Sequence, residues 1–302
     1  MNALNRQHFH FNFKAMGTPC DLQLFAPDPA TAQKVADLAI QDIQRLERKY
    51  SRYRDDSLLS DINRVADQGG SIAVDEETAG LLHYADACHQ QSDGLFDISS
   101  GLLRKAWRFD KGQLPEQTLI ASLLERVGWE KVRWSPPELT FLVPNMELDF
   151  GGIVKEYAAD RVATLCRQAG CRHGLVNLGG DVKIIGPRMD GQPWRIGIAH
   201  PRNKNALLES LALHQGAVAS SGDYERCIII DGKRYSHVLN PKTGWPVGHL
   251  TSVTVISDHC VIAGSASTIA MLKEVQGPVW LKDLGLPHIW TDIQGRQGGS
   301  IT

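Results

Sequence analysis

Apolar and polar residues alternate along residues 8–26, on both sides of the segment "MGTP" at 16–19. Alternation with a period of two is typical of strands with one covered face, so we predict a β-hairpin that turns at this segment. Asp28 and Pro29 follow, a pair typical of a helix N-cap and a first helical residue. Apolar residues then recur at helical spacing, which predicts a long amphipathic helix to about residue 49. They are Val35, Ala39, Ile43 and Leu46.

The same patterns divide the rest of the first half into short elements. We predict a turn and a short helix within 51–64, helices at 76–91 and 117–127, and an ordered loop at 94–107. Three short strands are expected at 130–134, 139–143 and 146–150, separated by the breakers "SPP" and "PN".

The second half is predominantly strand-like. Residues 149–170 predict a strand end, a Gly-Gly turn and a helix that Gly170 closes as C-cap. Asp258 is expected to cap a helix over about 260–274, before a final short helix and strand. Strands are expected at 173–178, 182–186, 194–199, 207–213, 217–220, 227–230 and 250–257. Helices and strands mix without regular alternation, linker or repeat, so we predict one α+β domain over 1–302.

Composition and charge mainly argue against certain classes of protein and of site. The 302 residues are 42% apolar and 22% charged, which is enough apolar material for a substantial core. The net charge of −2 gives no reason to expect nucleic-acid binding, which needs a basic surface. The six cysteines form no CxxC pair, so we expect buried thiols in a reducing compartment rather than a disulfide framework or a zinc site.

Neither a membrane span nor an export signal is visible. The longest nearly uncharged apolar run, "CVIAGSASTIAML", has about a dozen residues, whereas a membrane helix needs roughly 20. The segment "MNALNRQHFHFNFKAMG" lacks the apolar region of a signal peptide. We therefore expect a soluble, cytoplasmic protein, or a periplasmic one if a leader has been removed.

Two glycine pairs offer places for a phosphate. "FGGIVKEY" puts Gly151 and Gly152 at a helix N-terminus, where free N–H groups and the helix dipole favour an anion, and Lys155 adds a positive charge. "VNLGGDV" at 176–182 forms a second turn of this kind after an apolar strand. Neither segment matches the GxGxxG or P-loop pattern, and ordinary tight turns use the same residues.

Serine and histidine side chains supply two further candidates. "AVASSGDYERC" ends a strand in Ser220 and Ser221, which either bind a phosphate or complete a turn. "RYSHVLNPKTG" places His237 at a strand end before a turn, either as a base that faces a substrate or as a packed histidine. A serine hydrolase that uses Ser221 and His237 is the last alternative, because no GxSxG elbow is present.

Together these motifs resemble those of the FAD:protein FMN transferase (ApbE) family. Eight blocks occur in the family's order over about residues 15–270: "AMGT", "SRYRDDSLLSDIN", "DGLFD", "LDFGGIVKEYAAD", "NLGGD", "SSGDYER", "SHVLNPKTG" and "GSASTIA". The resemblance implies an ApbE-like, T-fold-related architecture of mixed sheets with flanking helices, two intimately packed lobes and FAD between them. It also implies a magnesium-dependent enzyme that cleaves the FAD pyrophosphate, releases AMP and attaches FMN to a threonine of an acceptor protein.

The resemblance also implies roles for individual residues. His237 is the expected base near the acceptor hydroxyl, and Lys155 is a second catalytic candidate. Magnesium contacts are implied for the backbone carbonyl of Val154 and for the hydroxyls of Ser267 and Thr268. FAD contacts are expected from Met16, Tyr53, Leu95, Phe96, Asp97, Gly151, Gly152, Ser221 and Val238. These residue types suit phosphoryl transfer, which depends on positioning and charge neutralisation.

Three positions depart from the family's pattern. Gly264 stands where an aspartate is usual, Glu156 where a glycine is usual, and Asn240 where an aspartate is common. Because glycine offers no side-chain ligand, we hypothesise that Glu156 supplies the carboxylate for the metal. The alternative is a solvated glutamate that the helix dipole favours.

Two related functions stay open at this point. A flavin-binding module without metal chemistry would keep the FAD pocket but transfer nothing. An FAD pyrophosphatase would use water in place of the acceptor and give free FMN and AMP. The partner implied for a transferase is an acceptor flavoprotein with a Ser/Thr-Gly-Ala-Thr-like segment, and no oligomeric state is predicted.

Overall fold

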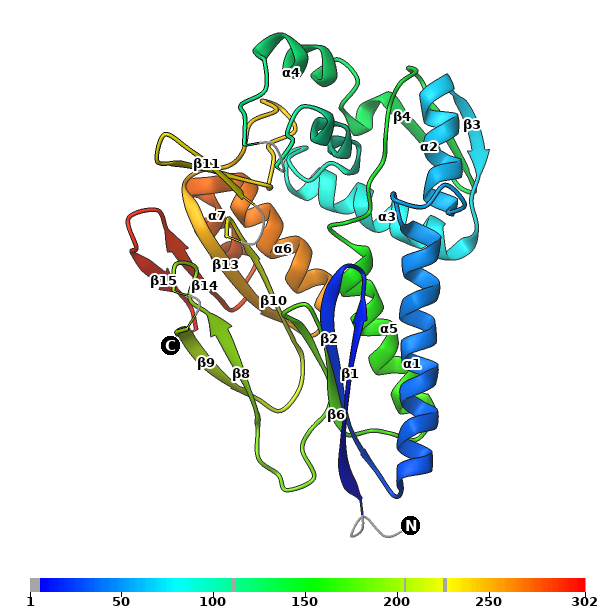
Figure 1. Ribbon diagram of the computed structural model, residues 1–302, viewed down its shortest axis with the longest axis vertical. Coiled ribbons are helices and arrows are strands. Elements are labelled where there is room, and N and C mark those ends of the chain that lie inside the picture. The colour runs from blue at the N-terminus through cyan, green and yellow to red at the C-terminus, as the bar shows by residue number, and fades with distance from the viewer. Residues whose placement is uncertain (1–5, 110–111, 204, 225–226, 302) are drawn as a thin grey trace.

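The computed structural model describes residues 6–109, 112–203, 205–224 and 227–301. Helices and strands are interspersed along the chain (Figure 1), which confirms the α+β class. The α-helices are α1 (Pro29–Tyr50), α2 (Leu58–Gln68), α3 (Glu76–Gln91), α4 (Gln117–Leu124), α5 (Val154–Gln168), α6 (Cys260–Lys273) and α7 (Gly277–Asp283). Short 3₁₀ helices are η2 (Ile98–Lys105), η3 (Trp129–Lys131) and η4 (Glu274–Gln276).

An eight-stranded sheet forms the centre of the molecule, in the order β1-β2-β6-β7-β10-β13-β14-β15, and all neighbouring strands are antiparallel. Its strands are β1 (Gln7–Ala15), β2 (Thr18–Ala26), β6 (Gly174–Leu178), β7 (Asp181–Gly186), β10 (Ala217–Gly222), β13 (Leu250–Ser257), β14 (His288–Asp292) and β15 (Gln297–Gly299). Three smaller sheets pair β3 (Gly70–Ala73) and β4 (Val132–Ser135) with β5 (Glu138–Phe141), β8 (Trp194–Ala199) with β9 (Leu207–Leu213), and β11 (Cys227–Ile230) with β12 (Lys233–Ser236).

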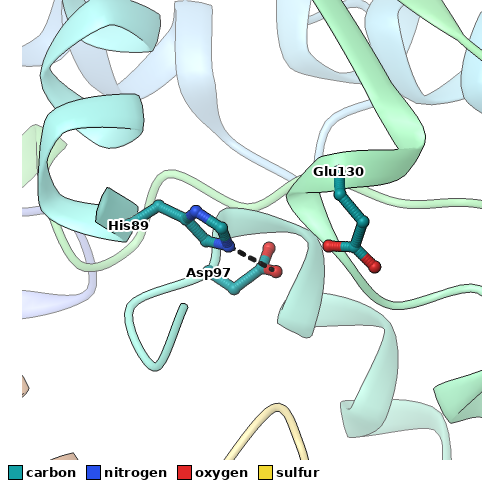
Figure 2. Close-up of side chains that lie close together, drawn as sticks. All are labelled: His89, Asp97 and Glu130. Atoms are coloured by element: carbon teal, nitrogen blue, oxygen red, sulfur yellow. Dashed lines mark ion pairs between the residues drawn. The ribbon is translucent and has the colours of Figure 1, made fainter. Parts of the chain in front are cut away.

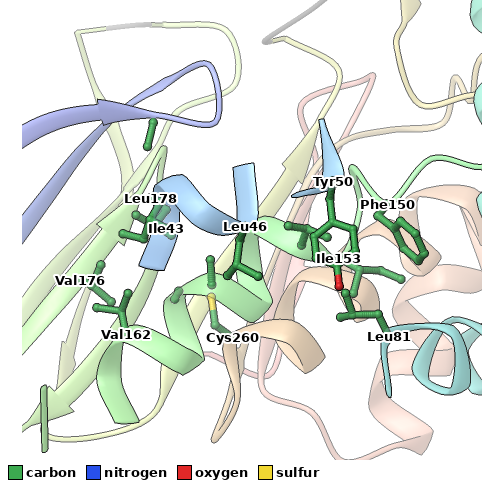
Figure 3. Close-up of a cluster of buried hydrophobic side chains, with 14 of the residues drawn as sticks. Ile43, Leu46, Tyr50, Leu81, Phe150, Ile153, Val162, Val176, Leu178 and Cys260 are labelled. Carbon is green, nitrogen blue, oxygen red and sulfur yellow. The ribbon is translucent and has the colours of Figure 1, made fainter. Parts of the chain in front are cut away.

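Both faces of the large sheet are covered. Helices α1, α5 and α6 pack on one face, and Figure 3 shows side chains of α1, α5 and the sheet packed together in the main core. The β8–β9 hairpin packs on the other face, where Trp194 and Ile196 contact Ile184 of the sheet. Because it lies between two layers, every residue of β7 is buried.

The first two elements form as their sequence predicts. Strands β1 and β2 pair as a hairpin, with Ala15 opposite Thr18 at the turn. The Asp28 carboxylate accepts a hydrogen bond from the Thr31 amide at 2.7 Å, so it is the N-cap of α1. The predicted apolar face of this helix is fully covered by the core.

The strand predicted at 146–150 is wrong. This segment lies in no sheet, because its amides bond to residues of α2 and η2 instead of a neighbouring strand. Met146 N donates to Ala66 O at 3.2 Å and Asp149 N to Ile98 O at 2.8 Å. The loop expected at 94–107 contains the 3₁₀ helix η2, and the short strand β3 was not predicted.

The predicted cap of α6 is also wrong. His259 occupies the N-cap position, and no side chain of the preceding turn caps the helix. The Asp160 carboxylate of α5 accepts the amide hydrogens of Cys260 and Val261 at 2.9 and 3.0 Å. A residue 100 positions earlier in the chain therefore caps this helix, which a local sequence pattern does not reveal.

A second core lies under η2 and α4. It joins these helices to the β11–β12 hairpin through Leu103, Trp107, Ile120 and Ile228. The six cysteines are free thiols, and all except Cys227 are buried, as expected. Among the helices of the described ranges, none combines the length and the hydropathy that crossing a bilayer requires.

Candidate active site

The first turn of α5 is tied to the start of β7 by an ion pair. The ammonium group of Lys155 contacts the carboxylate of Asp181, and Asp181 Oδ1 also accepts the Ser220 amide hydrogen at 3.2 Å. Both glycine turns seen in the sequence thus meet here, because Lys155 follows the first pair and Asp181 follows the second. Asp181 was missed as a site residue, although it ends the quoted block "NLGGD".

Three hydroxyl groups gather beside this pair. Ser221 Oγ of β10 lies 2.8 Å from Ser267 Oγ and 2.9 Å from Thr268 Oγ1 of α6. Ser267 in turn donates to the carbonyl oxygen of Gly264 at 2.9 Å. Strand β10 and helix α6 pack against each other, which brings the predicted serine–threonine pair to Ser221.

Glu156 points into the interior between α5 and α6. Its side chain is buried, with Oε1 3.9 Å from Lys155 Nζ, and its Oε2 has no hydrogen-bond partner among the described residues. The solvated glutamate considered from the sequence is therefore wrong. Burial, and then the negative charge of Asp181, raise the pKa of the Glu156 carboxyl.

The loop before α2 approaches the first glycine turn. Arg52 forms an ion pair with Asp149, its guanidinium lies 5.0 Å from the centre of the Tyr53 ring, and Asp149 Oδ1 accepts the Gly151 amide hydrogen at 2.9 Å. Tyr53 is 77% exposed, so much of its surface is accessible to solvent beside this turn. Arg52 and Asp149 were missed, although both lie within the quoted blocks.

Phe96 and Gly152 are in contact. A Cβ atom at Gly152 would lie 3.4 Å from the Phe96 ring, so the turn and the "DGLFD" segment touch. Leu95 and Val238 pack against one hydrophobic cluster, and a Cβ at Gly94 would lie 3.7 Å from Lys242 Cε. The "DGLFD" segment therefore bridges the glycine turn and the "NPKTG" turn.

The Asp97 carboxylate holds its own loop. Its Oδ1 accepts hydrogen bonds from the amide and hydroxyl of Ser99 at 2.8 and 2.7 Å, and its Oδ2 accepts the Trp129 amide hydrogen at 2.9 Å. His89 Nε2 lies 3.7 Å from Oδ2, and Glu130 completes a group whose ligand atoms lie within 4.8 Å of one another (Figure 2). Since both Asp97 oxygens already accept protein hydrogen bonds, the structure favours a loop-positioning role.

His237 follows directly after β12 and is exposed. The turn beyond it is closed by Asn240, whose Oδ1 accepts the amide hydrogens of Lys242 and Thr243 at 2.9 and 3.3 Å. An amide oxygen makes these bonds as a carboxylate oxygen would, so the departure at Asn240 leaves the turn intact. Trp107 Nε1 also donates to Gly244 O at 2.7 Å and fixes the turn to the second core.

Met16 lies at the tip of the β1–β2 hairpin, with φ of 52°. The hairpin packs on the second glycine turn, because Gly179 N donates to Pro19 O at 3.1 Å and Thr18 abuts Gly179. A side chain at Gly179, which has φ of 64°, would collide with Thr18. The hairpin tip therefore lies beside the segment that leads to Asp181.

Sequence comparison finds named relatives. The chain is 34% identical over 255 residues to a FAD:protein FMN transferase of Klebsiella pneumoniae, covering 82% of this chain and 77% of that protein. A FAD:protein FMN transferase of Haemophilus influenzae is 29% identical over 250 residues, covering 79% and 72%.

Solved structures share the fold. The ApbE protein of Thermotoga maritima superposes with a TM-score of 0.88 at 29% identity, covering 98% of this chain and 97% of that one. The flavin transferase ApbE of Vibrio cholerae also gives 0.88, at 25% identity and 98% coverage of both chains. The ApbE family model matches residues 16–290. These matches span nearly all of the elements described above, and the chain belongs to the ApbE family.

Proposed function

We propose that this protein transfers FMN from FAD to a threonine hydroxyl of an acceptor protein and releases AMP. The relatives named FAD:protein FMN transferase support the reaction. The observation in the structure that carries it is the meeting of Lys155, Asp181 and the three hydroxyls of β10 and α6 beside the N-terminus of α5. Such a site offers cationic, N–H and hydroxyl groups to a pyrophosphate. We take the chain as one functional domain, because the groups come from both halves of the sequence.

The flavin part of FAD is assigned to the exposed aromatic face beside the first glycine turn. Tyr53 offers its ring, and Phe96 borders Gly152 at the glycine turn. Met16, Leu95, Val238 and Ser221 are assigned to the walls of the same site. Asp97 is assigned an indirect part, because its carboxylate holds the segment that carries Leu95 and Phe96.

The donor set fits a magnesium ion. Magnesium prefers oxygen ligands and shares them with substrate phosphates. The Val154 carbonyl, the hydroxyls of Ser267 and Thr268, and the Glu156 carboxylate would hold it, and the partnerless Oε2 of Glu156 is a buried acceptor that a cation satisfies. When bound, the ion would neutralise charge that builds up on the pyrophosphate.

The chain's own residues position and activate the reactants. The threonine Oγ attacks the phosphorus of the FMN half, a P–O bond to this phosphorus forms, and the anhydride P–O bond to the AMP half breaks. His237 is assigned as the base that takes the hydroxyl proton, since an imidazole accepts a proton near neutral pH. AMP leaves with the bridging oxygen, and Lys155 places a positive charge near the reacting phosphates. The Ser221 hydroxyl is tied to α6, which does not favour a serine nucleophile.

Mass spectrometry of an acceptor tests this proposal. The protein is incubated with FAD, magnesium and an acceptor flavoprotein that carries a Ser/Thr-Gly-Ala-Thr segment. We expect the acceptor to gain one FMN unit and AMP to appear in equal amount, with both products lost in EDTA. An acceptor whose target threonine is replaced by valine is the control. Free FMN without labelled acceptor would point to a pyrophosphatase, and bound but intact FAD would point to a flavin-binding module.

A further inference from the structure

Glu156 of α5 and Gly264 of α6 share one space. The two helices pack against each other, and a Cβ atom built at Gly264 would lie 2.5 Å from Glu156 Cγ, 3.0 Å from its Cδ and 3.1 Å from its Oε1. A Cβ atom does not approach a non-bonded carbon as closely as 2.5 Å. The present position of the Glu156 side chain therefore depends on the absence of a side chain at 264, and a side chain at 264 would force Glu156 to move.

The Glu156 carboxylate has more acceptor capacity than its surroundings use. Its Oε2 is buried without a partner among the described residues, although such a loss of hydrogen bonding is costly inside a protein. The neighbouring ammonium of Lys155 is engaged with Asp181 and lies 3.9 Å from Oε1. Two carboxylates thus face a single lysine at this place, and a further cation would balance them.

The hydroxyl cluster is connected to the Gly264 backbone. Thr268 lies one helical turn beyond Gly264, and Ser267 donates to the Gly264 carbonyl. Ser221 joins both hydroxyls from β10. A carboxylate that reaches the Gly264 position from α5 therefore lies at the start of the helical turn that carries Ser267 and Thr268.

We propose that Glu156 is the anionic ligand of the divalent cation in the proposed FMN transfer, and that Glu156 and Gly264 act as one exchangeable pair. This inference rests on the proposed function. A glutamate carboxyl carbon lies one bond beyond Cγ, and an aspartate carboxyl carbon lies one bond beyond Cβ. Since Cγ of Glu156 lies only 2.5 Å from a Cβ built at 264, an aspartate at 264 combined with glycine at 156 would bring its carboxylate into the same space.

This geometry makes an unusual prediction for four variants. Glu156→Gln keeps the shape but removes the charge, and Glu156→Gly removes the group. Gly264→Asp alone adds a carboxylate but collides with Glu156, so it damages the site instead of improving it. The double variant Glu156→Gly/Gly264→Asp removes the collision and returns one carboxylate.

The test measures Mn²⁺ binding by electron paramagnetic resonance, with the full chain and saturating FAD and without acceptor. Quenching of flavin fluorescence reports FAD binding in the same samples. We expect Glu156→Gln to weaken Mn²⁺ binding about ten- to a hundredfold, as the loss of a charged partner does. The double variant should bind within a fewfold of the wild type. Glu76→Gln, which changes an exposed carboxylate on α3, is the matched control and should leave binding unchanged.

Melting temperatures without metal separate a metal role from a purely structural one. Glu156→Gln should melt at or above the wild-type temperature, because a buried unpaired carboxylate becomes a neutral amide. Equal Mn²⁺ affinity of wild type and Glu156→Gln, with FAD bound, overturns this inference alone. A double variant no better than Glu156→Gly contradicts the exchangeable pair. A wild-type protein that binds neither FAD nor Mn²⁺ overturns the proposed function and this inference together.

Discussion

Lys155, in the first turn of α5, pairs with Asp181, the first residue of β7. The pair fixes the two glycine turns against each other, and Asp181 extends the link to β10 through the Ser220 amide. The lysine thus has two effects in the proposed reaction: it places one positive charge at the phosphates and it holds Asp181 in position.

Removing this lysine should slow transfer strongly. Lys155→Ala leaves two carboxylates without their cation, and we expect kcat/KM for FMN transfer to fall about 10²–10³-fold, as for the loss of one electrostatic contact to a reacting group. Lys155→Arg should retain part of the rate. The control is Lys34→Ala on the exposed face of α1, and a rate for Lys155→Ala equal to that of this control would refute the role.

Replacement of His237 should affect chemistry more than binding. The side chain is exposed after β12, so His237→Gln should fold normally. Loss of a general base lowers rates typically 10²–10⁴-fold. We expect the transfer rate to fall in this range while the affinity for FAD stays constant, measured by single-turnover kinetics and flavin fluorescence. His214→Gln, an exposed histidine elsewhere, should behave as wild type; a similar loss in both variants would argue against a base at 237.

The cap of α6 predicts a stability difference between two aspartates. Asp160→Ala removes the acceptor of the Cys260 and Val261 amides, so we expect it to lower the free energy of unfolding by about 1–2 kcal/mol. Asp258→Ala should change it by less than about 0.5 kcal/mol, because its side chain does not cap the helix. Urea titration of both variants measures these changes in the free energy of unfolding. A larger loss for Asp258→Ala than for Asp160→Ala would show that a residue next to the helix caps α6.

Acid should destabilise the fold through Glu77. Hydrogen bonds from Arg45 lower the pKa of the Glu77 carboxyl to about 2, from 4.5 in the unfolded chain. Burial opposes this shift, and the hydrogen bond and charge of Lys49 reinforce it. The folded-state pKa is the lower one, so the stabilisation is complete above about pH 4.5 and is lost as the pH falls towards 2. Its full size is on the order of 3 kcal/mol. Glu77→Gln should flatten the unfolding free energy over this window, whereas the exposed neighbour Glu76→Gln should keep the slope.

Local sequence patterns predicted the elements whose bonds are local. The β1–β2 hairpin, the Asp28 cap and the glycine turn before α5 depend on residues a few positions apart, and all three were found. The segment at 146–150 shows the limit, since its amides bond to α2 and η2, which the local sequence pattern does not place nearby.

The candidate site shows the same contrast between residues that sequence motifs identify and residues that only the packing of the fold brings together. Lys155, Ser267 and Thr268 stand in motifs, so the sequence named them. Asp181 was missed because its importance comes from a lysine 26 positions away, which only the packing of α5 on the sheet brings close. The relation between Glu156 and Gly264 was suspected from the sequence, but the shared space depends on how α5 and α6 pack.

The hydroxyl and carboxylate cluster draws on α5, β7, β10 and α6. During synthesis, the chain must therefore leave the ribosome at least as far as Thr268 before these groups can meet. Before that point, the β1–β2 hairpin, α1 and α5 lack the groups of α6 that complete the cluster. A nascent chain whose α6 has not yet packed against β10 thus lacks this cluster, and flavin transfer must wait for that packing.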